Sequence, residues 1–277
     1  MNYRHAFHAG NFADLAKHAA VSLLLDSLQA EAGALCVIDT HAGAGLYDLT
    51  GSMARKSGEA EAGILRLMTD SNTPAAFQAL KSAVGRLNSQ GPVTLYPGSP
   101  RLIAERLRLG DAYLGAELHE EDFILLQQAL IPFRPSAQAF KTDGFDLAEH
   151  AAGAHKRVFV LVDPPFERAD DYRRTIELSG RLLRRNSEAC LAIWTPLKDL
   201  ETFDAFVRGL EETVRSAILV SELRLKPLDN PLRLNGCAMI FVNAPRYLAL
   251  SFQPALDWLV QHLGEPGALS RQWTAGV

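Results

Sequence analysis

The chain has 277 residues, of which 48% are hydrophobic, and a formal net charge of −4 at pH 7. This hydrophobic content is ample for a folded core, whereas the negative charge excludes a global positive field, so any nucleic acid must bind at a local patch. The polar start leads into no apolar signal segment, and no apolar run approaches the ~18–20 residues that span a bilayer. We therefore expect a cytoplasmic protein with no membrane partner, and a monomer is the favoured state.

The first predicted element is an amphipathic helix over residues 12–29. Its apolar stripe lies opposite Asp14 and His18, but farther along the chain that opposite face also becomes apolar. We therefore expect both sides of the helix to be covered at one end. Its polar half either faces a ligand or is solvated.

Seven strand-like runs follow, mostly with helical patterns between them, which is typical of a mostly parallel α/β sheet. They cover residues 35–39, 112–118, 137–141, 158–163, 190–195, 218–225 and 237–242. Each of the three cysteines lies in one of these runs, so we expect buried thiols rather than disulfides or a zinc site. The loop between the last two runs is too short for a helical crossover, so we expect those two strands to be antiparallel.

One interval in the chain is too long for a simple strand–helix–strand unit. Such a unit needs ~30 residues, and more than twice that number separate the first two runs. Residues 47–95 therefore predict an inserted small helical subdomain in a core formed by residues 1–46 and 96–277. Within the insertion we expect Thr73 to cap a helix that has Pro74 at its first position.

The strongest chemical signal is the sequence Asp163-Pro164-Pro165-Phe166 at the end of an apolar strand. Ligands of open α/β sheets bind beyond the carboxyl ends of the strands. The Asp163 carboxylate can accept a hydrogen bond from one N–H of an amine, and the Pro164 carbonyl can accept one from the other. The consecutive prolines fix the backbone. The Phe166 ring offers a stacking surface for an extruded base. The alternative is a rigid turn that merely ends the strand.

A second signal, the run from Asp39 to Gly45, follows the first strand and includes His41 and Gly43. Glycines at such a turn let the backbone approach a nucleoside cofactor closely. The pattern Asp-x-x-x-Gly-x-Gly lacks the third glycine of dinucleotide sites; it resembles the first motif of methyltransferases that use S-adenosylmethionine (SAM).

Acidic residues end the next two strands. The Glu117 carboxylate is placed to accept hydrogen bonds from the hydroxyls of a ribose. The Asp143 side chain and the Gly144 N–H are placed to form hydrogen bonds with the edge of an adenine. Each alone is more often a turn residue, but four successive strand ends with suitable groups favour a cofactor site.

Three further features have competing explanations. Ser99 precedes a proline and a helical run, so it is first a helix N-cap and only additionally a ligand. The early histidines lack a standard metal-ligand spacing, and we expect no metal. The arginine-rich stretch 168–185 either meets phosphates or forms a solvated helix face. The early histidines are His5, His8, His18 and His41.

The N-terminal run from Tyr3 to Asn11, followed by Asp14, Lys17 and His18, resembles the signature of the RlmJ family, bacterial 23S ribosomal RNA adenine-N6 methyltransferases. The resemblance continues through the motifs at 39–45, 96–100, 117–119, 143–145 and 163–165, and through Gly236 and Met239, so it covers nearly the whole chain. It implies a Rossmann-like methyltransferase fold with a small helical insertion.

The resemblance also implies roles for particular residues. SAM contacts would come from His18, His41, Ser99, Glu117, Asp143 and Gly144, with Lys17 nearby. Asp163 would accept the amine proton, and Tyr3 would lie near the substrate base. The family pattern has tyrosine where this chain has Phe166, so a hydroxyl is missing at that place.

These observations predict direct transfer of a methyl group from SAM to the exocyclic N6 of an adenine in 23S ribosomal RNA. Asp163 then stabilises the charge that develops on the amine. A DNA adenine-N6 methyltransferase shares the same chemistry, and a non-catalytic RNA-binding protein is possible on the same fold. A protein glutamine methyltransferase would favour Asn at position 163, and a NAD-dependent oxidoreductase would need the third glycine.

Overall fold

The computed structural model describes residues 4–168, 170–230 and 233–276. Its central sheet has eight strands in the order β10-β8-β9-β7-β6-β1-β4-β5. The strands span β1 Leu35–Asp39, β4 Ala112–Ala116, β5 Ala137–Phe140, β6 Arg157–Val162, β7 Cys190–Leu197, β8 Ile218–Arg224, β9 Gly236–Val242 and β10 Leu269–Ala275.

All seven predicted strands are present in the sheet, and the eighth strand was not predicted. The pairings from β5 through β4, β1 and β6 to β7 are parallel. β9 is antiparallel to both β7 and β8, which confirms the expected pair at the end of the chain. β10 pairs antiparallel with β8 at the edge of the sheet, and its polar, mostly uncovered sequence gave no strong apolar pattern.

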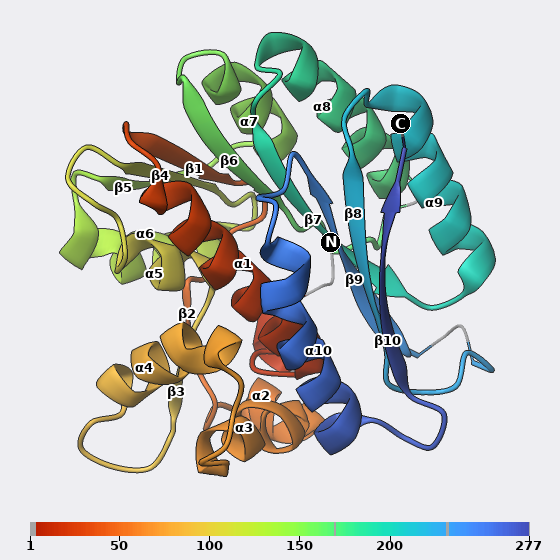
Figure 1. The fold of residues 1–277 in the computed structure, drawn as a ribbon. Helices are drawn as coiled ribbons and strands as arrows, with labels where there is room; N and C mark the ends of the chain where they lie inside the picture. The colour runs from red at the N-terminus through yellow and green to blue at the C-terminus, as the bar shows by residue number, and fades with distance from the viewer. Residues whose placement is uncertain (1–3, 169, 231–232, 277) are drawn as a thin grey trace.

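Helices cover the two faces of the sheet and make it a three-layer structure (Figure 1). One face packs against α7 Gly144–Ala152, α8 Asp171–Arg185 and α9 Leu200–Thr213. The other packs against α1 Phe12–Ala30, α5 Ser99–Ala104, α6 Glu120–Leu130 and α10 Leu248–Leu263. α1 contacts α10, α5 and β9, so it is covered on more than one side, as its apolar pattern indicated.

The segment between β1 and β4 adds short elements at one end of the sheet (Figure 1). They are β2 Leu46–Asp48, α2 Ser52–Ser57, a π-helical turn Glu61–Leu65, α3 Arg66–Thr69, a 3-10 turn Ala75–Phe77, α4 Gln78–Leu87 and β3 Leu95–Pro97. β2 and β3 pair antiparallel across the base of the segment. The predicted cap at Thr73 was wrong, because a 3-10 turn with Pro74 as its N-cap precedes α4.

Within the described residues, no helix is long and apolar enough to cross a membrane. All three cysteines are buried and free. The short turns after β1, β4, β5 and β6 all leave the sheet at the carboxyl edge of parallel strands. This edge is where such sheets place their ligands.

Candidate active site

A pocket of about 400 Å³ opens at the carboxyl edge of the sheet, between the N-terminal half of α1 and the turns that follow the parallel strands. Most residues with a predicted role line it: Lys17, His18, His41, Gly43, Ser99, Glu117, Asp143, Gly144, Asp163 and Pro164. The prediction for Tyr3 falls outside the described residues. Phe166 is not among the lining residues.

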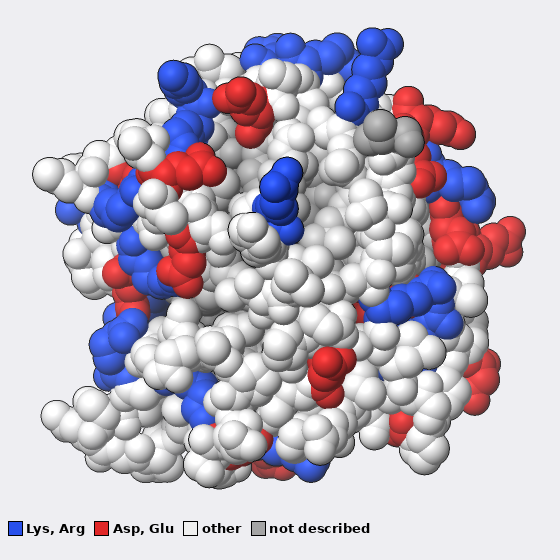
Figure 2. Space-filling model, viewed as in Figure 1, with Lys and Arg blue, Asp and Glu red and all other residues white. Residues whose placement is uncertain are grey.

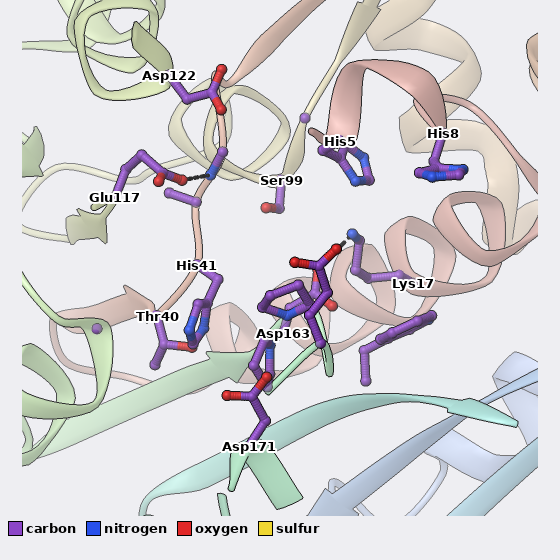
Figure 3. A pocket seen from close by; sticks show the side chains of 18 of the residues that line it. His5, His8, Lys17, Thr40, His41, Ser99, Glu117, Asp122, Asp163 and Asp171 are labelled. Carbon is purple, nitrogen blue, oxygen red and sulfur yellow. Dashed lines mark hydrogen bonds and ion pairs between the residues drawn. The ribbon is translucent and has the colours of Figure 1, made fainter. Parts of the chain in front are cut away.

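Lys17 and Asp163 form an ion pair at the centre of the pocket (Figure 3). The Lys17 Nζ atom lies 2.7 Å from Asp163 Oδ2 and 3.0 Å from Asp14 Oδ1. Asp14 also accepts from the Gly10 N–H at 2.9 Å, and its Oδ2 lies 3.0 Å from His5 Nε2. One ammonium group therefore bridges two carboxylates that come from α1 and from the end of β6.

The charges of this network shift its pKa values in different directions. Burial raises the pKa of Asp163 and outweighs the opposing effect of Lys17. Burial also acts to raise the pKa of Asp14, but the charges of His5 and Lys17 outweigh it and hold this pKa well below its usual value. Lys17 thus sits beside one strongly acidic carboxyl and one carboxyl with an elevated pKa.

Asp39 is a second buried carboxyl, fully shielded behind the pocket. The Asp39 Oδ2 atom accepts two hydrogen bonds, one from Ser99 Oγ at 2.7 Å and one from the Tyr113 hydroxyl at 3.1 Å. Burial raises the pKa of Asp39 to about 6. The expectation that Ser99 is an N-cap was wrong: Gly98 occupies that position, and Ser99, the first helical residue, uses its hydroxyl to tie α5 to β1.

The turn after β1 brings the backbone of Gly43 next to the Glu117 side chain. The Gly43 N–H donates to Glu117 Oε2 at 3.0 Å, and the His119 N–H donates to Oε1 at 2.7 Å. Gly43 has φ +63°, and a Cβ there would lie 2.3 Å from the Tyr47 hydroxyl. The left-handed backbone favours glycine at this position, so the N–H that the turn after β1 donates to Glu117 depends on it.

Asp143 and Gly144 begin α7 and close the other side of the pocket. Asp143 caps the helix by accepting from the Phe145 N–H at 2.9 Å, and it also accepts from Arg174 at 2.7 Å. A Cβ on Gly144 would lie 1.7 Å from the Thr40 carbonyl oxygen, so glycine permits α7 to touch the turn after β1. Burial lowers the pKa of the adjacent His41 to about 4, so its ring is neutral at pH 7.

His18 has one unsatisfied ring nitrogen. Its Nδ1 atom lies 2.7 Å from the Tyr96 hydroxyl, whereas its buried Nε2 atom has no hydrogen-bond partner within the part of the chain that the structure describes. Burial lowers the pKa of His18 to about 3, so the ring is neutral. A buried nitrogen without a partner costs free energy, and in a pocket wall it indicates a ligand-binding position.

Phe166 does not present its ring to the pocket. The side chain is 7% exposed, and its ring packs against Tyr172 with centroids 4.5 Å apart, and against Trp194 and Phe206. Its φ of +51° turns the chain after Pro165 and directs the ring inward. The stacking role expected for Phe166 therefore has no support in this arrangement, and a ring without a hydroxyl suits an apolar cluster.

Sequence reasoning missed several residues of the site. The only separate role considered for His5 was that of a metal ligand, which its spacing did not favour, but in the structure His5 contacts the buried Asp14. Within the described ranges no group of His, Cys, Asp and Glu side chains is arranged to hold a metal. On α8, the arginine-rich pattern did not distinguish Arg174, which faces the pocket, from Arg173 and Arg181, which pair with Glu177 and Glu149. Trp194 and Lys198 line the pocket from β7 and the turn after it, with no motif to indicate them.

Comparison with known proteins places this geometry in context. Residues 32–275 match the family described as "Ribosomal RNA large subunit methyltransferase D, RlmJ". The chain is 33% identical over 270 residues to ribosomal RNA large subunit methyltransferase J of Escherichia coli K12, covering 96% of this chain and 95% of that one. It is 30% identical to the Haemophilus influenzae protein of the same name, with 99% and 97% covered.

Two solved structures support the fold. A Legionella pneumophila protein superimposes with a TM-score of 0.87 at 26% identity, over 97% of this chain and 98% of that one. A probable spermidine synthase from Corynebacterium glutamicum gives a TM-score of 0.51 at 12% identity over 92% and 74%. The second resemblance shows the sheet and helix arrangement alone.

Proposed function

Because this chain belongs to the RlmJ family of large-subunit ribosomal RNA methyltransferases, we propose that it transfers a methyl group from SAM to the exocyclic N6 of an adenine in 23S ribosomal RNA. The observation that carries the adenine-N6 assignment is the placement of Asp163 and Pro164 in the pocket, with Lys17 bound to the carboxylate. A carboxylate beside a backbone carbonyl is suited to an amine with two N–H groups.

The pocket residues fit SAM as the methyl donor. Glu117 offers a carboxylate to vicinal hydroxyls, and Asp143 offers one to an amino group, as cofactor contacts require. The unsatisfied Nε2 atom of His18 is a further position for a polar contact. When bound, SAM supplies an electrophilic methyl group on a positively charged sulfur.

At the target base, the chain orients the amine and stabilises positive charge. Asp163 accepts an N–H through oxygen lone pairs that Lys17 does not occupy, and the Pro164 carbonyl accepts the second. Asp163 then receives the proton as the nitrogen becomes cationic, which stabilises the transition state rather than the ground state. Lys17 orients this carboxylate and opposes the burial that raises its pKa.

The surface charge limits how RNA is bound. On the face drawn in Figure 2, basic and acidic side chains are interspersed along the rims, and the centre over α1 and α10 carries few charges. We infer that recognition depends on the shape and sequence around one nucleotide, extruded into the pocket. This fits a substrate in which a specific adenine is presented.

Methyl transfer from labelled SAM tests the proposal. Protein-free 23S ribosomal RNA and double-stranded DNA are incubated separately with the protein, digested to nucleosides and analysed by mass spectrometry. We expect N6-methyladenosine from the RNA alone. Label in DNA would instead favour a DNA enzyme, and SAM binding without label in either would favour a binding protein or a substrate found only in an assembling ribosomal particle.

A further inference from the structure

We propose that Arg174 is a specificity-determining positioning residue: it holds the Asp143 carboxylate so that the pocket selects a purine with an amino group over one with an oxo group. This inference rests on the proposed function, because it assigns Asp143 to the adenine of SAM. It adds a residue of α8, outside the predicted cofactor site, to the recognition of the cofactor.

Arg174 lies in the first turn of α8 and reaches across to the start of α7. Its Nη2 atom donates to Asp143 Oδ2 at 2.7 Å, and its guanidinium carbon lies 4.2 Å from the centre of the Phe145 ring. The same ring meets His41 edge-on, with centroids 5.2 Å apart. Arg174, Asp143 and His41 all line the pocket, so this cluster forms a wall of the cofactor site.

The hydrogen bonds of Asp143 define what it can recognise. Its Oδ1 accepts from the Phe145 N–H and its Oδ2 from Arg174, so the carboxylate is fixed at both oxygens. Each oxygen has a second lone pair, and an ionised carboxylate can only accept hydrogen bonds. An amino group donates to such an oxygen, whereas an oxo group presents a second acceptor and is repelled.

Arg174 maintains this acceptor-only state. Burial raises the pKa of Asp143, but the hydrogen bond from Arg174, the Phe145 N–H and the arginine charge outweigh it and keep the pKa below its ordinary value. Without Arg174 the carboxylate loses its principal cation and one of its two fixed bonds. A carboxyl that rotates or takes up a proton discriminates poorly between donor and acceptor groups.

The neighbouring Arg173 provides a matched control. It follows Tyr172 on the same helix turn, but it is 62% exposed and pairs with Glu177 and Asp170 on its own side of α8. Replacing it removes the same charge from the same turn without touching Asp143. Any effect confined to Arg174 therefore reports the contact with Asp143.

The test measures equilibrium binding of S-adenosylhomocysteine and of its oxo analogue, S-inosylhomocysteine, by titration calorimetry. We expect the unaltered protein to prefer the adenine compound, and Arg174→Ala to reduce that preference by about tenfold or more, the scale of one charge-assisted hydrogen bond. Arg173→Ala should keep the preference within about twofold. Arg174→Lys keeps the charge but not the planar fork, so it should be intermediate.

A double-variant cycle separates positioning from a general effect on the fold. If Arg174 acts through Asp143, Arg174→Ala should change the preference little when Asp143→Ala is already present. An unchanged preference in both Arg174→Ala and Arg174→Lys would overturn the inference while leaving the proposed function intact. Failure of the unaltered protein to bind either compound would overturn both.

Discussion

The two walls of the pocket hold their charges in different surroundings. On the wall formed by α1 with the ends of β1 and β6, the side chains of Asp14, Lys17 and Asp163 are 2%, 7% and 15% exposed. On the wall formed by the starts of α7 and α8, Asp143 and Arg174 are 27% and 22% exposed. We refer to these as the buried wall and the half-exposed wall.

The difference determines how each wall responds to change. In the buried wall, removal of one charge leaves its partner uncompensated where little water reaches it, so we expect folding and catalysis to suffer together. In the half-exposed wall, water can replace a lost partner, so the loss acts mainly on ligand recognition. In the proposed function the chemistry therefore depends on the less replaceable wall, and cofactor selectivity on the more replaceable one.

The largest effect should come from Asp163. Asp163→Ala removes the acceptor for the amine, and we expect methyl transfer to 23S ribosomal RNA to fall by roughly 10³-fold. Asp163→Asn keeps one oxygen acceptor and should lose less. Binding of S-adenosylhomocysteine should change only a few-fold in both, and loss of that binding would show that Asp163 is a cofactor or structural residue.

Lys17→Met should impair both folding and transfer. Asp14 and Asp163 would face each other without the ammonium that bridges them, and breaking a buried ion pair in this way costs about 3–5 kcal/mol. The pKa of Asp163, already raised, would rise further. On acidification the variant would therefore lose activity at a higher pH than the unaltered protein. Urea denaturation measures the loss of stability, and a pH–rate profile measures the shift in pH dependence. If the acidic side of the profile does not shift in the variant, Lys17 does not control the pKa of Asp163.

The sequence predicted the buried wall only in part. Asp163 and Asp39 end neighbouring parallel strands, and because such ends meet at one edge, their proximity was predictable. The pairing of Lys17 with Asp163 was not, because it depends on how α1 rotates over the sheet, and both sides of α1 are covered. Its polar half was equally compatible with solvent.

The half-exposed wall and the sheet edge show another limit. Arg174 is one of six arginines between residues 168 and 185, five of which lie in α8, and only packing distinguishes the one that faces Asp143. Phe166 had the expected place in the motif, but its left-handed backbone and aromatic neighbours are tertiary features. The polar sequence of β10 becomes a strand because β8 offers it a free edge.

His18 provides a test of burial on the buried wall. Its pKa is about 3 in the folded protein and 6.5 in an ordinary environment, so the unfolded chain binds more protons as the pH falls from 6.5 towards 3. This group alone should therefore lower the free energy of unfolding by about 2 kcal/mol between pH 7 and pH 5. Between pH 7 and pH 5, the free energy of unfolding of the variant His18→Gln should therefore fall by about 2 kcal/mol less than that of the unaltered protein.

Urea denaturation of both proteins at the two pH values measures the difference. His41 and Asp39 also have shifted pKa values of about 4 and about 6, but they titrate in both proteins and largely cancel. Equal losses in the two proteins would show that the His18 ring is hydrated and that the buried wall is more open to water than its geometry indicates.

The smallest effect on stability should come from Arg174→Ala. The Arg174–Asp143 pair is partly exposed on both sides, and pairs of this kind contribute about 0–1 kcal/mol because water and salt screen them. We expect the free energy of unfolding to fall by less than about 1 kcal/mol, far less than for Lys17→Met. Denaturation of the two variants in one buffer provides the comparison, and a loss from Arg174→Ala as large as that from Lys17→Met would show that both walls are integral to the fold.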